Sequence, residues 1–462
     1  MRRAFLGPGG LALALLACAG TPPPELTPAV ADERHVPAGE TPLVVDDSGR
    51  VPAGEAERAL GRAAETSSLR LRARALSKAV EARTEVPLVR GNHTRLLIDG
   101  PSTYAAMLAA VEGARHHIHL ETYIFADDEV GRHFMEALAR KRRQGVAVRI
   151  IYDAIGSIAS DRDFFAGMVE QGIEVAEFRP LRPASLWRIN NRDHRKLAVI
   201  DGRIAFTGGL NISGTYSKAS TSRPGPEEGV REGWRDTHLE IRGPAVRLLQ
   251  SVFLQTWSRL GRPAPPAAAA LFPELEEQGR DLVQVVSSEG GDAREFRIYT
   301  AYLAAIENAS ERIWISQAYF APNVEFRKAL SAAAQRGVDV RVIAPSFTDS
   351  RLIHYGARAT YGSLLESGVR IYEHEDALMH AKTAVIDGVW STVGSANIDQ
   401  RSFIHNNELN AAVVSAELAR DMEAMFRRDL ESSRRIDATE WKERPARERI
   451  SEFLSSLLAH WL

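Results

Sequence analysis

The chain carries one eight-residue motif twice, and this duplication constrains its fold more than any other feature. Residues 194–201 read H-x-K-x-x-x-x-D, and residues 380–387 repeat the pattern. In both copies a glycine follows the aspartate, and an asparagine, Asn211 or Asn397, lies at the same distance beyond it. A single match is also compatible with a buried structural histidine and a surface lysine. Two matches in one context indicate two related half-sites that together build one active site.

The segments around the motifs alternate between strand-like and helical patterns, in the same order in both halves. Strand-like runs cover residues 118–125, 146–152, 173–178, 313–320, 338–344 and 369–373. Glycines that predict left-handed caps end the intervening helices, at Gly145, Gly172, Gly337 and Gly368. Such alternation is typical of βαβ units. We therefore expect an α/β fold of two pseudo-symmetric halves, each a mixed, largely parallel β-sheet flanked by helices, with the active site at their interface.

The N-terminus predicts export and a lipid anchor. Two arginines precede the short apolar run 11–17, which is typical of a signal peptide and too short to span a bilayer. Cys18, the only cysteine, follows directly, as in bacterial lipoproteins. A plain cleaved signal with an incidental cysteine is the alternative. Lipidation would hold the protein in the cell envelope, on the periplasmic side of a membrane, or at the outer membrane if the source is Gram-negative.

Composition divides the rest of the chain. Residues after Cys18 are rich in proline, glycine and acidic side chains, which favours a flexible tether. The expected division is a lipoprotein signal peptide over 1–17, a flexible tether over 18–55, a helical lead-in over 56–85, a first half over 86–261, a connection over 262–279 and a second half over 280–462.

The two motifs suit the chemistry of a phosphodiester. Residues two apart on a strand share a face, so His194 and Lys196 point the same way, as do His380 and Lys382. One imidazole must be neutral to attack phosphorus, and the other must be protonated to donate to the leaving oxygen. The two lysines would stabilise charge on the remaining oxygens.

Further polar groups near the motifs complete the predicted site. Phosphate-binding groups are expected at Asn211, Asn397, Gly209 and Ser395. Two carboxylates, Asp236 and Glu408, are expected to orient the histidines, and the sequence leaves open which serves which; ordinary ion-paired carboxylates are the alternative. The motif aspartates Asp201 and Asp387 belong to the catalytic signature, but we interpret them mainly as turn residues. Histidines 116, 117 and 119 lack nearby ligands and are read as structural, so we expect no metal site.

These residues resemble the phospholipase D superfamily, and within it the bacterial cardiolipin synthases. The resemblance covers residues 86–462 and includes the segments 121–125, 152–157, 191–196, 206–211, 394–399 and 401–403. It implies that His194 is the nucleophile, that His380 is the general acid and then base, and that no metal or organic cofactor is needed. The implied reaction joins two phosphatidylglycerols and releases glycerol. Typical cardiolipin synthases begin with transmembrane helices, whereas this chain begins with a lipid-anchor pattern.

Three functions remain open at this stage. The first is a membrane-associated phosphatidyltransferase of cardiolipin synthase type with a phospholipid substrate. The second is a phospholipase D that uses water, or a phosphodiesterase acting on nucleic acid. The third is a non-catalytic lipid-binding protein. A net charge of −2 offers no overall cationic field, so we expect no nucleic-acid partner. Since one chain holds both half-sites, a dimer is not required.

Two segments outside the motifs are candidates for contact with a membrane. The basic stretch 179–203 contains Trp187 and is compatible with a loop on an anionic bilayer or with a solvated loop. At the C-terminus, apolar residues recur at helical spacing from Ile450 to Trp461. For these we expect core packing rather than membrane contact.

Overall fold

The computed structural model describes residues 41–47, 49–181, 190–218, 220, 233–266, 268–290, 296–348 and 351–457. The expected signal peptide, Cys18 and Trp187 lie outside these residues. No helix in the described ranges combines the length and the apolar content needed to cross a membrane.

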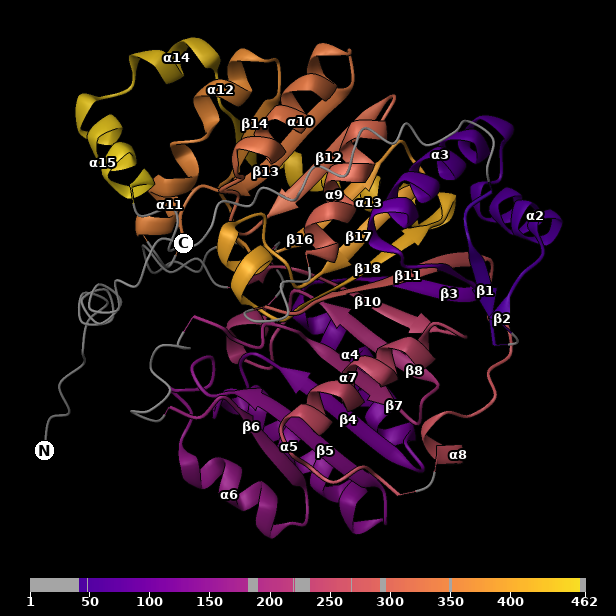
Figure 1. Ribbon diagram of the computed structural model, residues 1–462. Helices are drawn as coiled ribbons and strands as arrows, with labels where there is room; N and C mark the ends of the chain where they lie inside the picture. The colour runs from indigo at the N-terminus through magenta and orange to yellow at the C-terminus, as the bar shows by residue number, and fades with distance from the viewer. Residues whose placement is uncertain are drawn as a thin grey trace, which may run out of the picture.

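The first half is one seven-stranded sheet, with helices on its faces (Figure 1). Hydrogen bonding gives the strand order β6-β5-β4-β7-β8-β10-β3. The elements are β3 (Leu88–Ile98), α4 (Asp99–Gly113), β4 (His117–Thr122), α5 (Glu129–Arg143), β5 (Ala147–Asp153), α6 (Arg162–Glu170), β6 (Glu174–Phe178), β7 (Leu197–Ile200), β8 (Ile204–Gly208), the 3₁₀ turn η2 (Gly214–Tyr216), β9 (Trp234–Arg235), β10 (Thr237–Arg242) and α7 (Val246–Arg259). The short helix α8 (Ala268–Leu271) lies in the connection.

The second half repeats this topology. Its strands follow the order β14-β13-β12-β16-β17-β18-β11, with β19 added at the β14 edge. The elements are β11 (Asp281–Ser288), α9 (Arg297–Asn308), β12 (Arg312–Gln317), α10 (Val324–Gln335), β13 (Asp339–Pro345), α11 (Arg351–Arg358), α12 (Tyr361–Glu366), β14 (Arg370–His374), β15 (Leu378–Met379), β16 (Lys382–Ile386), β17 (Trp390–Gly394), the π-helical turn η4 (Arg401–His405), β18 (Glu408–Val414), α13 (Ala416–Glu431), β19 (Ser433–Arg435), α14 (Ala438–Glu443) and α15 (Ala446–Ser456). The duplication inferred from the motifs is therefore present in the fold.

The two sheets meet at corresponding strands. β3 pairs antiparallel with β11, so the sheets run into one another across the centre of the molecule. A hydrophobic cluster also spans the boundary, with Phe253 and Trp257 of α7 on one side and Met422 and Phe426 of α13 on the other. Because both contacts bury apolar surface between the halves, the halves are held as one body.

The expectation of a largely parallel sheet is wrong. Strands β4-β5-β6 and β12-β13-β14 pair in parallel, as their βαβ connections require. Most other pairings are antiparallel, because each motif is followed by a two-residue hairpin and not by a crossover helix. The sheet is mixed and largely antiparallel.

The hairpins and helix ends follow the predicted turn chemistry. Gly145, Gly172, Gly337 and Gly368 take φ values of 91°, 80°, 89° and 94°. In the first hairpin Asp201 and Gly202 have φ of 54° and 62°; the matching pair in the second has 53° and 66°. Two successive residues with positive φ match the twist of a tight antiparallel hairpin. The prediction of turns at the motif aspartates is confirmed.

The predicted flexible tether, residues 18–55, extends too far toward the C-terminus. Residues 44–46 form β1, which pairs with β3 and with β2 (Gly49–Arg50), and α2 begins at Ala53. Val44 and Val51 are buried in the core, which the surrounding proline, glycine and acidic residues did not indicate. The helical lead-in is present as α2 (Ala53–Ala64) and α3 (Ser67–Thr84), and α3 packs on α9.

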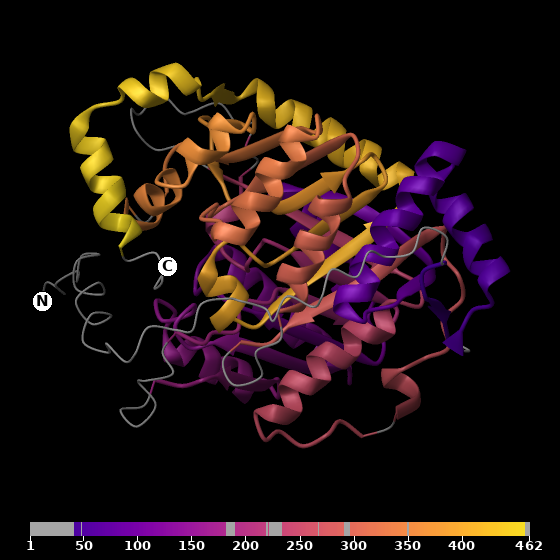
Figure 2. The same cartoon turned by 45° about the horizontal axis from the view of Figure 1, so that its top comes forward.

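The C-terminal helices run along the outside of the second half (Figure 2). The prediction that the apolar residues of the C-terminal segment pack into the core is wrong: Ile450, Phe453 and Leu454 on α15, and Leu457 directly after it, are exposed. Leu458 and Trp461 lie outside the described residues.

Candidate active site

Each motif histidine is held by the opposite half of the molecule. His194 precedes β7, and its backbone N–H donates to the carbonyl of Asn407, 2.9 Å away in the second half. His380 precedes β16, and its N–H donates to the carbonyl of Arg235, 2.7 Å away in the first half. The short strands β9 and β15 pair in parallel beside this contact. The two histidines are thus brought to the interface by exchanged backbone hydrogen bonds.

The orienting carboxylates are crossed in the same way. Glu408 of the second half lies 3.0 Å from Nδ1 of His194, and Asp236 of the first half lies 2.6 Å from Nδ1 of His380. Both carboxylates are fully buried. If each Nδ1 carries its proton toward the carboxylate, each Nε2 presents a lone pair for chemistry. This answers the question that the sequence left open.

The motif lysines lie beside the histidines, as expected. Nζ of Lys196 donates to the carbonyl of His194 at 2.6 Å, and Nζ of Lys382 lies 3.1 Å from Nδ1 of His380. Both side chains are buried. Two lysine side chains in a desolvated interface favour the binding of an anion.

Burial and these cations depress the pKa values of the basic groups. Burial lowers the pKa of His194 well below its usual value, and the charges of Lys196 and Lys382 lower it further. The same causes lower the pKa of His380 to about 4. Burial lowers the pKa of Lys196 to about 7. All three shifts express the cost of holding positive charge in a buried site, which a bound phosphodiester anion would offset.

The two carboxylates differ in charge preference. Burial raises the pKa of Glu408 to about 7, although Lys196 opposes the shift. Burial also opposes ionisation of Asp236, but the charges of His380 and Lys382 outweigh it, so the pKa of Asp236 is lowered. An anionic Asp236 stabilises an imidazolium at His380 better than Glu408 does at His194. The carboxyl groups beside the two histidines therefore differ in their tendency to ionise.

The predicted phosphate-binding groups are only partly available. Oδ1 of Asn211 accepts from the N–H of Ile124, and Nδ2 donates to Tyr216. Oδ1 of Asn397 is buried and has no hydrogen-bond partner among the described residues. The asparagines remain candidates, since each retains an amide N–H.

Gly209 and Ser395 have other roles than the predicted phosphate binding. Their N–H groups donate to sheet carbonyls, those of Thr237 and Leu409, both at 3.0 Å. The hydroxyl of Ser395 donates to Glu408 and accepts from the N–H of Leu409. A Cβ at Gly209 would lie 2.1 Å from Oδ1 of Asp236. Both residues therefore position the carboxylates.

The motif aspartates lie at the opposite ends of their strands from the histidines and act on backbone. Asp201 accepts N–H bonds from Arg115, His116 and His117 at 2.7–2.8 Å. Asp387 accepts the equivalent bonds from residues 310–312 at 2.8–2.9 Å. The structure does not support counting Asp201 and Asp387 as catalytic residues. Their carboxylates accept backbone hydrogen bonds that connect each hairpin to the start of β4 or β12.

Several side chains at the site escaped sequence reasoning. The ring of Tyr123 meets His194 edge-on at 5.0 Å and lies 5.2 Å from Nζ of Lys196. The hydroxyl of Tyr216 lies 3.3 Å from Nδ1 of His380, and Trp234 lies against the same imidazole. Tyr123 directly follows β4. Because binding residues often lie at the carboxyl ends of parallel strands, its position could have indicated a place in the site. Tyr216 and Trp234 carry no comparable signal.

Part of the basic stretch 179–203 is buried. Arg192 and Arg195 are buried, and Arg195 lies 3.7 Å from Glu121 and donates to Thr256. These two arginines are thus not available to a membrane surface. Within the described residues, no group of three or more histidine, cysteine, aspartate or glutamate side chains could hold a metal ion.

The duplicated α/β topology with paired histidines at its interface defines the phospholipase D fold class. The family described as "Cardiolipin synthase, PLD-like domain" matches residues 107–220 and 302–430. The chain is 38% identical over 375 residues to the cardiolipin synthase of Geobacillus kaustophilus (strain HTA426), an alignment that covers 81% of this chain and 73% of that protein. It is 37% identical over 373 residues to cardiolipin synthase 2 of Bacillus anthracis, with 79% and 70% covered. The chain therefore belongs to the cardiolipin synthase PLD-like family and is a phosphatidyltransferase of the phospholipase D superfamily.

A solved structure supports the fold independently. The phosphatidylserine synthase of Haemophilus influenzae Rd KW20 superposes with a TM-score of 0.61 at 11% sequence identity, covering 83% of this chain and 99% of that one. At this identity the comparison bears on the fold alone.

Proposed function

We propose that this enzyme is a cardiolipin synthase that transfers a phosphatidyl group from one phosphatidylglycerol to the glycerol hydroxyl of a second. Relatives that carry the name cardiolipin synthase, aligned over most of the chain, support this substrate. The observation that carries the proposal is the crossed arrangement in which each histidine takes its carboxylate from the opposite half.

The first step uses His194 as nucleophile. Nε2 of His194 attacks phosphorus, the bond between phosphorus and the glycerol oxygen breaks, and His380 gives that oxygen its proton. Glycerol leaves, and the phosphatidyl group remains on His194. A neutral His194 and an anionic Asp236 behind His380 are the charge states that this step needs.

The second step reverses the role of His380. Its neutral Nε2 accepts the proton of the hydroxyl of the second phosphatidylglycerol as that oxygen attacks phosphorus. The phosphorus–nitrogen bond breaks, His194 is restored, and cardiolipin is formed. Lys196 and Lys382 stabilise the charge on the non-bridging oxygens in both steps.

Product analysis tests the proposal. The purified enzyme is incubated with vesicles that contain phosphatidylglycerol with labelled acyl chains and a labelled glycerol headgroup. Cardiolipin and free glycerol in equal amounts support transfer. Phosphatidic acid as the sole lipid product refutes it and assigns the same site to hydrolysis. His194→Ala and His380→Ala should each abolish turnover.

We further propose that acylated Cys18 anchors the enzyme to the periplasmic side of a membrane of the cell envelope, on the sequence pattern described above. Mass spectrometry of the enzyme purified from membranes should give a mature chain that begins with a lipid-modified cysteine. A mature chain that begins elsewhere refutes the anchor and leaves the proposed reaction untouched.

A further inference from the structure

The C-terminal helix α15 presents its apolar residues to the outside. Ile450, Phe453, Leu454 and Leu457 are 58%, 63%, 56% and 61% exposed. Their spacing places them on one side of the helix. Nine large apolar side chains are exposed in the described part of the chain, and these four are among them. Such a concentration on one short helix marks an interaction surface.

The inner side of α15 is polar, the reverse of an ordinary surface helix. Glu452 and Ser455 are the buried residues of this helix. Glu452 accepts hydrogen bonds from Arg444 and lies 3.5 Å from Arg358. These ion pairs help to attach α15 to α11, and the apolar residues of α15 remain more than half exposed.

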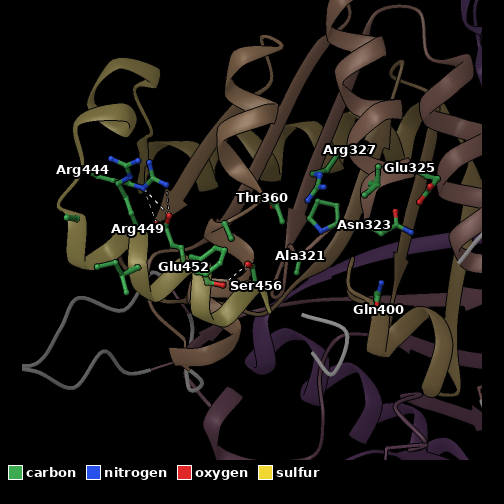
Figure 3. Close-up of a pocket in the computed structure, with 17 residues that line it drawn as sticks. Ala321, Asn323, Glu325, Arg327, Thr360, Gln400, Arg444, Arg449, Glu452 and Ser456 are labelled. Carbon is green, nitrogen blue, oxygen red and sulfur yellow. Dashed lines mark hydrogen bonds and ion pairs between the residues drawn. The ribbon is translucent and has the colours of Figure 1, made fainter. Parts of the chain in front are cut away.

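A cavity of about 980 Å³ separates α15 from the N-terminal end of α10. Figure 3 shows the opposing walls, with Arg449, Glu452 and Ser456 on α15 and Ala321, Asn323 and Arg327 across from them. Ile450 and Phe453 line one wall, and Val324, itself 48% exposed, lines the other. Gln400, three residues after Asn397 in the sequence, also lines the cavity. The cavity therefore touches the loop that carries a candidate phosphate ligand.

The apolar face is bordered by positive charge. Arg447 and Arg449 are exposed on α15, and Arg327 lies in the opposite wall. Glu325 lies in the same wall as Arg327, but in the described ranges no carboxylate comes within ion-pair distance of any of these three arginines. Apolar side chains flanked by arginines match the interface of an anionic bilayer, where acyl chains take up the former and lipid phosphates the latter.

We propose that the α15 face, made of Ile450, Phe453, Leu454 and Leu457 with Arg327, Arg447 and Arg449, docks on an anionic phospholipid bilayer. The adjoining cavity then receives one lipid on its way to the active site. This inference rests on the proposed lipid substrate and deepens it, because it assigns the surface through which that substrate enters. A second copy of the chain is the competing occupant of the same face.

A label at a single thiol tests the docking directly. In the full chain Cys18 is the only cysteine, so Phe453→Cys combined with Cys18→Ser carries one attachment point for an environment-sensitive fluorophore. Leu71→Cys in the same background is the matched control, because Leu71 is 62% exposed on α3, which lies away from α15 in both overall views (Figures 1 and 2). On phosphatidylglycerol vesicles the emission at 453 should shift to the blue and rise at least twofold, and the emission at 71 should not change.

Two results would overturn the docking. One is an unchanged emission at 453 on vesicles. The other is a blue shift without vesicles that grows with protein concentration, which assigns the face to self-association. If the label at position 453 inserts into vesicles but the product is phosphatidic acid, the proposed docking surface is supported and the proposed acceptor, a second phosphatidylglycerol, is refuted.

Kinetics give a second, independent test. For Phe453→Ser combined with Leu454→Ser, the ratio of the rate on vesicles to the rate on detergent-dispersed phosphatidylglycerol should fall about tenfold or more, since two large apolar side chains leave the interface. The ratio for Leu71→Ser should match that of the unaltered enzyme. An equal ratio in all three proteins contradicts the proposal, and circular dichroism checks that the double variant is folded.

Discussion

Asp236→Asn tests the division of labour between the two histidines. The carboxylate of Asp236 lies 2.6 Å from Nδ1 of His380 and is fully buried. Opposite unit charges about 4 Å apart at an effective dielectric near 20 attract by about 4 kcal/mol. Losing that attraction removes about the same amount from the stability of the His380 imidazolium, which corresponds to a rate loss of about a thousandfold.

The substitution should also change the tautomer of His380. Oδ1 of Asp236 accepts from the N–H of Thr237 at 2.7 Å, so an asparagine keeps its oxygen there and turns its NH₂ toward Nδ1. Nδ1 of His380 then accepts, and the proton of the neutral ring moves to Nε2. That nitrogen can still hydrogen-bond to departing glycerol but cannot take a proton from the second phosphatidylglycerol. The second step should be slowed more than the first, and phosphatidyl-His194 should accumulate.

Glu408→Gln is the matched control, because it makes the same change behind His194. There the proton moves to Nε2 of the nucleophile, and no covalent intermediate should form. The assay quenches the enzyme with denaturing detergent at mildly alkaline pH after reaction with acyl-labelled phosphatidylglycerol and measures label on the protein, since phosphohistidine is acid-labile and strong alkali would cleave the acyl esters. The reasoning is refuted if Asp236→Asn retains activity within about fivefold, or if both variants accumulate the same amount of labelled protein.

Four further predictions follow from the geometry of the site and the core. Lys196→Met and Lys382→Met should each lower kcat by at least about a hundredfold, measured on vesicles, because each removes a buried cation beside a reacting histidine; a loss below about tenfold in both would contradict an electrostatic role. Gly209→Ala should inactivate the enzyme with little change in Tm, since its Cβ would displace Asp236; near-normal kcat would show that Asp236 need not stay in place. Asp387→Asn should lower the free energy of unfolding by about 1–3 kcal/mol in a urea titration while reducing kcat of the folded protein far less than Lys382→Met does; an unchanged urea midpoint with a large loss of kcat would make this aspartate catalytic. Burial lowers the pKa of His238 from 6.5 to about 4, so the unfolded chain takes up the proton first as the pH falls, and the stability that is intact above pH 6.5 is lost progressively toward pH 4. His238→Gln should flatten this acid-side decline in Tm, and an unaltered slope would show that the histidine does not contribute to it.

Much of the fold could be predicted because its signals are local. The duplicated motif and the helix-ending glycines predicted two equivalent halves, and the aspartate–glycine pairs predicted tight hairpins. The balance of parallel and antiparallel pairing was misjudged, because the strands after each motif return through hairpins to long-range partners such as β10 and β18. Burial was misjudged at both ends of the described chain for a similar reason. Val44 packs beside β3 from a polar segment, whereas the apolar residues of α15 are more than half exposed, and neither fact depends on neighbours in sequence.

The amino-acid sequence alone determined which residue types the site contains: two imidazoles, two ammonium groups and two carboxylates, a set that predicts phosphodiester chemistry. Only the tertiary structure decided how they are paired. Glu408 orients His194, and Asp236 orients His380, because the backbone of each motif hydrogen-bonds to the opposite half. The unequal tendency of the two carboxyl groups to ionise arises from burial and from neighbours that are distant in the sequence, which no local pattern encodes.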